Sequence, residues 1–135
     1  MMTMIALPHL DYAAVNHKTT EAVAHRIVTA LRRVRAMAIR DAVVNPLGYG
    51  LELVGHPVQA VVLEDLQSGQ TLETLEIPDS IRVEGIDGKT LGFTPLGALA
   101  DGSARSICIQ AGQRTIVLSV VPATGSVRMD PDNRR

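Results

Sequence analysis

The stretch Leu91-Gly92-Phe93-Thr94-Pro95-Leu96-Gly97 decides which fold class the chain is assigned to. Its first residues fit a β-strand, and Pro95 and Gly97 then favour a turn, because proline fixes φ and glycine tolerates positive φ. Two apolar, strand-like segments follow farther along the chain, and Phe93 is the only phenylalanine of the sequence. We therefore expect this stretch to lie near the end of a β-rich domain that closes with a hairpin.

Upstream of this stretch, residues 19–42 have the pattern of a single amphipathic helix. Apolar residues recur there at spacings of three and four, which places them in one stripe: Val23, Ile27, Leu31, Val34 and Ala38. Thr19 or Thr20 can cap its N-terminus, with Glu21 near the positive end of the helix dipole. Asn45-Pro46-Leu47-Gly48 ends the helical region. We expect the stripe to be buried on a sheet.

After the helix, residues 48–129 alternate with the period of β-strands. Eight short segments lie between turns rich in Gly, Pro and Asp: 50–54, 58–63, 71–77, 81–86, 90–94, 106–111, 115–121 and 126–129. Asp87-Gly88 and Ala111-Gly112 are typical of tight hairpin turns. The predicted fold is therefore α+β, with an N-terminal helix packed on about eight short, mostly antiparallel strands in a sandwich-type arrangement. The polar residues 130–135 are expected to be a flexible tail.

Length and composition narrow the range of functions. The chain of 135 residues is long enough for one domain with its own core. Hydrophobic residues make up 46% but aromatic residues only 2%, so the core must consist mainly of aliphatic side chains. A nucleic-acid reader that stacks bases on a row of aromatic rings is excluded.

The net charge of −1 is unevenly distributed. Residues 18–40 carry six basic residues against Glu21 alone, whereas residues 52–88 carry eight acidic residues against Arg82 alone. We therefore expect a basic helix and an acidic sheet region. These charges either keep two outer faces solvated or dock them on differently charged neighbours in an assembly.

Residue patterns for catalysis or metal binding do not emerge. The histidines, at 9, 17, 25 and 56, lie too far apart for two ligands on one helical face, which need i, i+4 spacing. Glu64 and Asp65 are neighbours in a strand, so their side chains point to opposite faces. No serine lies in a nucleophile elbow. Asp130-Pro131-Asp132-Asn133 lacks the glycine and closing glutamate of a calcium loop. We predict no enzyme activity, no cofactor and no metal.

The remaining sequence features are neutral about function. Cys108 is the only cysteine, which rules out an intramolecular disulfide, and its strand-like surroundings make it a packing residue. No run of 18 apolar residues is present, so the chain as given does not span a membrane. Residues 1–7 lack the charged start of a signal peptide.

Three local patterns, in this order along the chain, point to a known family. The first, Ala6-Leu7-Pro8-His9-Leu10, is similar to the A-x-P that closes a pilin transmembrane segment. The second, residues 30–40, resembles the helix motif L-x-x-A-R-x-x-A-I, with Val34 where Ala is usual. The third, residues 91–97, is similar to I-x-F-x-P-x-G, and Thr124-Gly125-Ser126-Val127-Arg128 follows two strands later, like G-R-I/V-x. Together with the helix-first order, they resemble the GspH/FimT family of minor pseudopilins of type II secretion and minor pilins of type IV pili.

The resemblance implies a pilin-like fold and a structural role. The chain would be a minor pseudopilin of a type II secretion system, at or near the tip of the periplasmic pseudopilus, helping assembly and protein export. Its partners would be other minor and major pseudopilins and the secreted substrate. Candidate contact residues are Leu96, Gly97, Ala98 and Leu99, which are apolar for a loop, although the same residues also fit a buried turn.

The family also implies a membrane anchor. Its prepilin signal, a Gly-Phe cleavage site followed by Thr and Glu and about twenty apolar residues, does not occur in this sequence. Residues 1–18 would be the remnant of a membrane-proximal segment. We therefore expect a parent protein that is methylated and held in the inner membrane of a Gram-negative bacterium by an N-terminal helix absent from this chain, with this domain in the periplasm.

The alternative within the family is a FimT-like type IV minor pilin that serves pilus assembly or DNA uptake. DNA-binding members resemble G-R-x-R, where this chain matches only Gly125 and Arg128 and has Ser126 in place of the first arginine. Candidate weak DNA contacts in this alternative are Arg128, Arg134 and Arg135, and the basic helix could add non-specific phosphate contacts. The missing arginine and the net negative charge do not favour a nucleic-acid partner.

Overall fold

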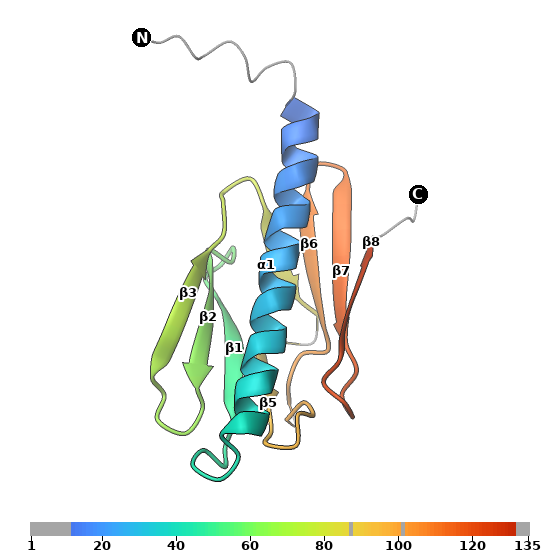
Figure 1. Ribbon diagram of the computed structural model, residues 1–135. Coiled ribbons are helices and arrows are strands. Elements are labelled where there is room, and N and C mark those ends of the chain that lie inside the picture. The colour runs from blue at the N-terminus through green and yellow to red at the C-terminus, as the bar shows by residue number, and fades with distance from the viewer. Residues whose placement is uncertain (1–11, 87, 101, 132–135) are drawn as a thin grey trace.

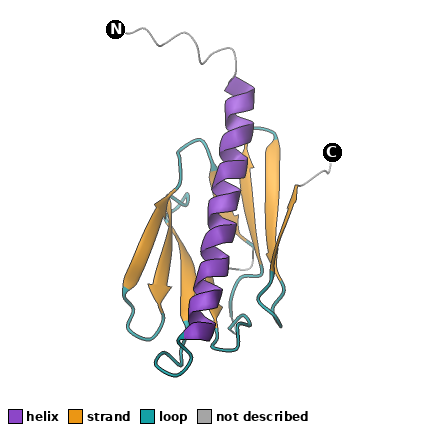
Figure 2. Ribbon diagram, viewed as in Figure 1, coloured by secondary structure: helices purple, strands orange, loops and turns teal. Residues whose placement is uncertain are grey.

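A computed structural model describes residues 12–86, 88–100 and 102–131 of the chain. One long helix, α1 (Tyr12–Arg40), precedes eight strands (Figures 1 and 2). The strands are β1 (Tyr49–Val54), β2 (Ala60–Asp65), β3 (Thr71–Glu76), β4 (Arg82–Gly85), β5 (Thr90–Phe93), β6 (Ser106–Ala111), β7 (Arg114–Val120) and β8 (Val127–Pro131).

The strands form two four-stranded sheets. Sheet A has the order β3-β2-β1-β5, and sheet B has the order β4-β6-β7-β8. Every strand pair in both sheets is antiparallel. The helix lies across both sheets on one side of the molecule (Figure 1). The predicted α+β fold of one N-terminal helix and eight antiparallel strands is therefore confirmed.

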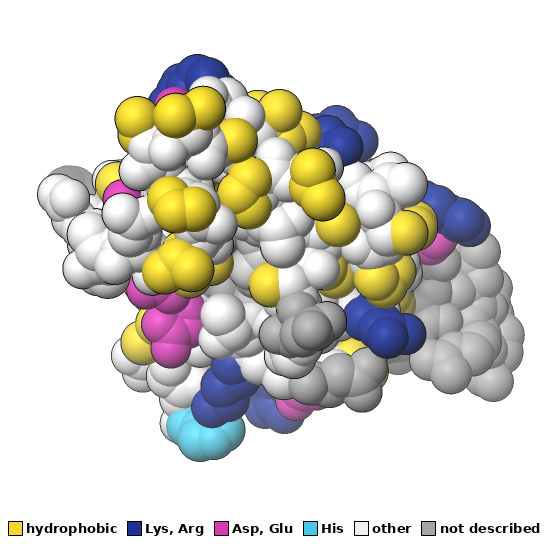
Figure 3. Space-filling view, turned by 90° about the horizontal axis from the view of Figure 1, so that it is seen from below, with side chains coloured by type: hydrophobic (Ala, Val, Ile, Leu, Met, Phe, Trp, Pro, Cys, Tyr) yellow, Lys and Arg dark blue, Asp and Glu magenta, His cyan; other side chains and the backbone are white. Residues whose placement is uncertain are grey.

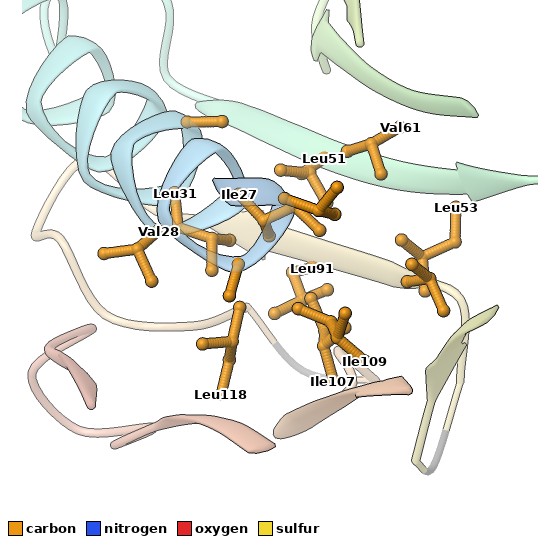
Figure 4. Close-up of a cluster of buried hydrophobic side chains, with 14 of the residues drawn as sticks. Ile27, Val28, Leu31, Leu51, Leu53, Val61, Leu91, Ile107, Ile109 and Leu118 are labelled. Atoms are coloured by element: carbon orange, nitrogen blue, oxygen red, sulfur yellow. The ribbon is translucent and has the colours of Figure 1, made fainter. Parts of the chain in front are cut away.

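The core lies where α1 faces the two sheets. All five residues of the predicted helical stripe are buried, together with Ala24, Val28 and Ala30. They meet the inward side chains of sheet A and of sheet B (Figure 4): Leu51, Leu53, Val61, Leu63, Leu91, Ile107, Ile109, Ile116, Leu118 and Val120. Phe93 is fully buried among them. Burying each large aliphatic side chain contributes about 1.5–3 kcal/mol, so this core supplies most of the stability.

Two ion pairs connect α1 to the sheets at its flanks. Arg33 pairs with Glu73 of β3 in sheet A, and Glu21 pairs with Arg114 of β7 in sheet B. Ion pairs this exposed typically contribute no more than about 1 kcal/mol each. Their main effect is to set the position of the helix over the two sheets.

The helix begins earlier than predicted. It starts at Tyr12, before the expected caps Thr19 and Thr20, and ends at Arg40. Thr20 is fully buried and continues the stripe of Val23 and Ala24 one turn toward the N-terminus. The cap assignment was therefore wrong, because a threonine on the buried face of a helix has the same sequence signature as a cap.

One predicted turn is confirmed and one is wrong. Ala111-Gly112 joins β6 to β7 in a tight hairpin, with Gly112 at a φ of 59°. Gly88 instead lies in a connection between sheets, since β4 belongs to sheet B and β5 to sheet A. The same turn residues occur in a hairpin within one sheet and in a connection between two sheets. The sequence could therefore not distinguish the two.

The two ends of the chain differ from their predicted boundaries. Residues 12–18 belong to α1, and the rest of the predicted membrane-proximal remnant lies outside the described residues. Strand β8 continues to Pro131, two residues into the predicted tail. Within the described ranges, no helix is both long enough and apolar enough to cross a membrane.

Candidate functional site

Exposed apolar side chains gather at the end of the molecule where α1 stops. Six of them come from the last turn of α1, the loop after it and two loops of the sheets: Ile39, Val43, Val44, Leu47, Leu96 and Val121. We call these six residues the end face. Val43 is 94% exposed and Leu96 is 89% exposed. Figure 3 looks at this end and shows hydrophobic side chains spread across it, with charged side chains mostly at the margin. Several large apolar side chains exposed on one face make that face a candidate interaction surface.

The buried side chain of Asn45 holds the loop that carries Val43, Val44 and Leu47. This side chain is only 4% exposed. Its Nδ2 donates to Asp65 Oδ1 at 2.9 Å, and its Oδ1 accepts a hydrogen bond from the Gly48 N–H at 3.0 Å. A buried amide that is bonded on both sides holds its backbone in one arrangement. The apolar side chains on either side of Asn45 are therefore presented by a rigid loop.

Asp41 fixes the start of the same loop. Its carboxylate accepts hydrogen bonds from Arg40 Nε and Nη2, at 2.9 and 3.0 Å, and from the Tyr49 hydroxyl at 2.6 Å. The bond from Arg40, followed by that from Tyr49, lowers the pKa of Asp41 from 3.8 to about 2. The bond to Asp41 raises the pKa of Tyr49. Asp41 is therefore ionised, and Tyr49 remains a donor to it, throughout the neutral range.

A junction around Arg35 holds the loops that carry Leu96 and Val121. Arg35 Nε donates to the Gly97 carbonyl at 3.0 Å and to the Thr124 carbonyl at 2.8 Å. Gly125 packs so closely that a Cβ on it would lie 1.9 Å from the Gly97 oxygen. Three segments distant in sequence thus meet at one arginine, and the end face is organised before any partner binds.

The four predicted contact residues divide between exposed and buried positions. Leu96 is exposed, as a contact residue requires, whereas Gly97 is buried and bonded to Arg35. Ala98 and Leu99 are half-buried, and the Leu99 N–H donates to the Pro122 carbonyl at 2.9 Å. The stretch is therefore a pinned turn that presents one apolar side chain. The buried-turn alternative therefore holds for Gly97, and partner contact at Leu96 stays a prediction.

Val43, Val44 and Leu47 were missed by the sequence analysis. A signal was present, because three apolar residues surround the Asn45-Pro46 turn, where the helix was already expected to end. Leu47 was attributed to the end of the helix, and Val43 and Val44 were given no role. The buried Asn45 that turns them outward could not be identified without its partner Asp65.

The predicted arginine contacts are only partly described. Arg128 lies on β8 and pairs with Asp130 at 3.3 Å, while Arg134 and Arg135 lie outside the described residues. A hollow of about 310 Å³ lies between α1 and the β7–β8 turn, with Arg32 and Arg35 beside Ser126. Arg32 and Arg35 of the helix therefore line this hollow together with Gly125 and Ser126, and Arg128 is not among its lining residues.

Groups suited to metal binding or to acid–base chemistry are the other candidates within the described ranges. No three His, Cys, Asp or Glu side chains gather there in a way that could hold a metal ion. Glu52 and Glu64 lie close together on β1 and β2, where burial and the neighbouring Glu52 raise the pKa of Glu64. The end face is therefore taken as the candidate functional surface.

Known proteins give no direct guide to the partner. Comparisons with models of protein families, with curated proteins and with solved structures find no match. The function is therefore inferred from the geometry of this chain and from the motif resemblance.

Proposed function

We propose that this chain is the periplasmic domain of a minor pseudopilin of a type II secretion system, which docks its end face on a neighbouring pseudopilin. The observation that carries the proposal is the end face itself, with exposed aliphatic side chains on loops that are pinned by Asn45, Asp41 and Arg35. A surface that is both apolar and rigid binds at a low entropic cost. It needs no catalytic group, in agreement with the expectation of a structural subunit.

The overall shape supports a filament subunit. The first turns of α1 extend beyond the sheets at one end of the molecule, and the end face lies at the other (Figure 1). A subunit with two different ends suits head-to-tail contacts, which generate filaments when they do not close into a ring. In the proposed parent protein, the helix continues into an inner-membrane anchor and the end face points away from the membrane.

The mechanism is packing. Val43, Val44, Leu47 and Leu96 would insert into an apolar surface of the neighbouring subunit, and burial of each is worth up to about 1.5–3 kcal/mol. A few such anchors commonly dominate an interface, while the surrounding charged rim excludes water and sets orientation. Docking at this end would help start assembly of the pseudopilus and so assist export.

Direct binding tests the proposal. The intact chain should bind the soluble domain of at least one other minor pseudopilin encoded beside it, measured by isothermal titration calorimetry. Leu96→Asp combined with Val43→Asp should abolish binding. Leu72→Asp replaces an exposed leucine on β3 that is not one of the six end-face residues, and this variant should still bind. Equal binding by all three proteins would refute the assignment of the end face.

A type IV minor pilin of the FimT kind is the second candidate. It is favoured by the hollow beside Gly125-Ser126, where Arg32 and Arg35 place two guanidinium groups near the family's DNA-binding motif. Arg128 is less available, because Asp130 partly neutralises it. Binding to duplex DNA separates the two candidates.

A further inference from the structure

A cleft lies at the other end of the sheets from the end face, where the β1–β2 turn approaches strand β4. Its volume is about 560 Å³, and His56, Pro57 and Val58 form one wall while Arg82–Gly85 forms the other. A second cleft of about 370 Å³ shares Pro57, Val58 and Arg82 and continues toward the β3–β4 connection. The two hollows therefore follow one line along β4.

Strand β4 is an edge of sheet B, and its free side faces this cleft. The Ile86 N–H donates to the Ser106 carbonyl at 2.9 Å, in register with the pairing of Glu84 with Cys108. Hydrogen-bonded pairs alternate along an antiparallel ladder, so Glu84 bonds to β6, whereas the N–H and C=O groups of Val83 and Gly85 point away from it. They point toward the cleft and can pair with an added strand.

Strand β5, an edge strand of sheet A, differs from β4 in how its free side is covered. It is covered by the chain's own backbone, since the Ala100 N–H donates to the Gly92 carbonyl at 2.8 Å and the Ala104 N–H donates to the Thr90 carbonyl at 2.9 Å. Edge strands are normally protected by such coverage or by charges. At β4, the described residues form no backbone hydrogen bond with the free side of Val83 or Gly85, and the cleft lies beside it.

The charged side chains that line the cleft indicate which kind of ligand it can bind. Lys89 Nζ lies 3.2 Å from His56 Nε2, so two basic side chains converge on it, and Arg82 adds a third. Glu84 is the single carboxylate among its described lining residues. Within the described part of the chain, Arg82 and Lys89 form no ion pair with a carboxylate. A negatively charged ligand fits this arrangement.

We propose that the cleft binds an extended, acidic peptide segment of a partner protein, which adds as a strand to β4. Main-chain pairing with Val83 and Gly85 supplies affinity, and contact of its carboxylates with Lys89, His56 and Arg82 supplies selectivity. This site is separate from the end face and does not depend on the proposed pseudopilin role.

Fluorescence anisotropy with the intact chain tests the proposal. The probe is a fluorescein-labelled peptide of alternating valine and glutamate. We expect a Kd tighter than about 1 mM. Lys89→Glu should raise the Kd by about fivefold or more. Loss of one exposed ion pair accounts for up to about fivefold, and repulsion by the new carboxylate adds to it. Arg105→Glu, an exposed arginine outside the cleft, should bind as the unmodified chain does.

Strand addition is distinguished from charge attraction by two further peptides and by amide hydrogen exchange. A peptide with lysine in place of glutamate, and one with alternate backbone nitrogens methylated, should each bind far more weakly. Amide hydrogen exchange should slow at Val83 and Gly85 when the acidic peptide is present. Absence of binding, equal binding of the methylated peptide, or unchanged exchange at both amides would overturn the proposal.

Discussion

The junction at Arg35 makes a sharp prediction for Gly125→Ala. Gly125 has a φ of 75°, and a Cβ built on it would lie 1.9 Å from the Gly97 carbonyl oxygen and 2.9 Å from Arg35 Nε. Gly69→Ala is the matched control, since Gly69 has a φ of 77° and nothing lies within 4 Å of its Cβ position. The two substitutions impose the same backbone strain and differ only in what the new methyl group meets.

The expected magnitudes follow from these contacts. The left-handed backbone conformation costs an alanine about 1–2 kcal/mol at either position. At Gly125 the methyl group must also displace the Gly97 carbonyl, an overpacking cost of about 1–3 kcal/mol. Loss of the Arg35–Gly97 hydrogen bond adds about 1 kcal/mol, a low value because the junction is only partly buried. Gly125→Ala should therefore lose about 2–4 kcal/mol more free energy of unfolding than Gly69→Ala.

Urea denaturation of both variants and the unmodified chain measures this difference. Unchanged m values would show that the same surface is exposed on unfolding, so that the midpoints report stability. The end-face loops should also become mobile in Gly125→Ala, visible as faster amide exchange at Leu96. Equal losses in the two variants would refute the idea that Gly97, Gly125 and Arg35 form one tight junction.

Other expected outcomes concern pH, the core and DNA. The folded-state pKa of Asp41, about 2, lies below its ordinary 3.8, so its ionised form stabilises the fold above about pH 4 and that contribution is lost as the pH falls toward 2. Between pH 4 and pH 2, the melting temperature of Asp41→Asn should fall less than that of the unmodified chain. Ile27→Asp, which buries a charge, should cost about 4 kcal/mol or more in urea melts, whereas Arg26→Asp on the exposed face should stay within about 0.5 kcal/mol. Duplex DNA should bind no tighter than about 10⁻⁴ M at physiological salt by fluorescence anisotropy. Micromolar affinity that falls with salt and is lost in Arg32→Ala, at the hollow beside Gly125-Ser126, would favour the type IV alternative.

The sequence predicted the elements better than their arrangement. Periodicity located the helix and all eight strands, because alternation and the three-to-four spacing reflect which side chains face the core. The division into two sheets could not be obtained in this way, since it depends on contacts between distant segments. The wrong hairpin at Gly88 has this cause: β4 and β5 follow each other in sequence but pair with β6 and β1.

The candidate site was predicted only in part for a related reason. Leu96 was recognised as an apolar loop residue, but the burial of Gly97 depends on Arg35, which lies 62 positions earlier in the chain. Val43 and Val44 face outward because Asn45 is bonded to Asp65 of β2. Such polar anchors leave no periodic signal, so a sequence pattern cannot tell a rigid docking loop from a simple helix end.

Photo-crosslinking in cells tests the docking role most directly. A photoreactive amino acid placed at Leu96 of the end face is compared with the same residue at Leu72 on β3, both in the parent protein expressed with its secretion genes. The proposed function predicts that illumination joins the Leu96 variant, but not the Leu72 variant, to another pseudopilin identified by mass spectrometry. Adducts with pseudopilins that are equally abundant at both positions, or absent from Leu96, would contradict it.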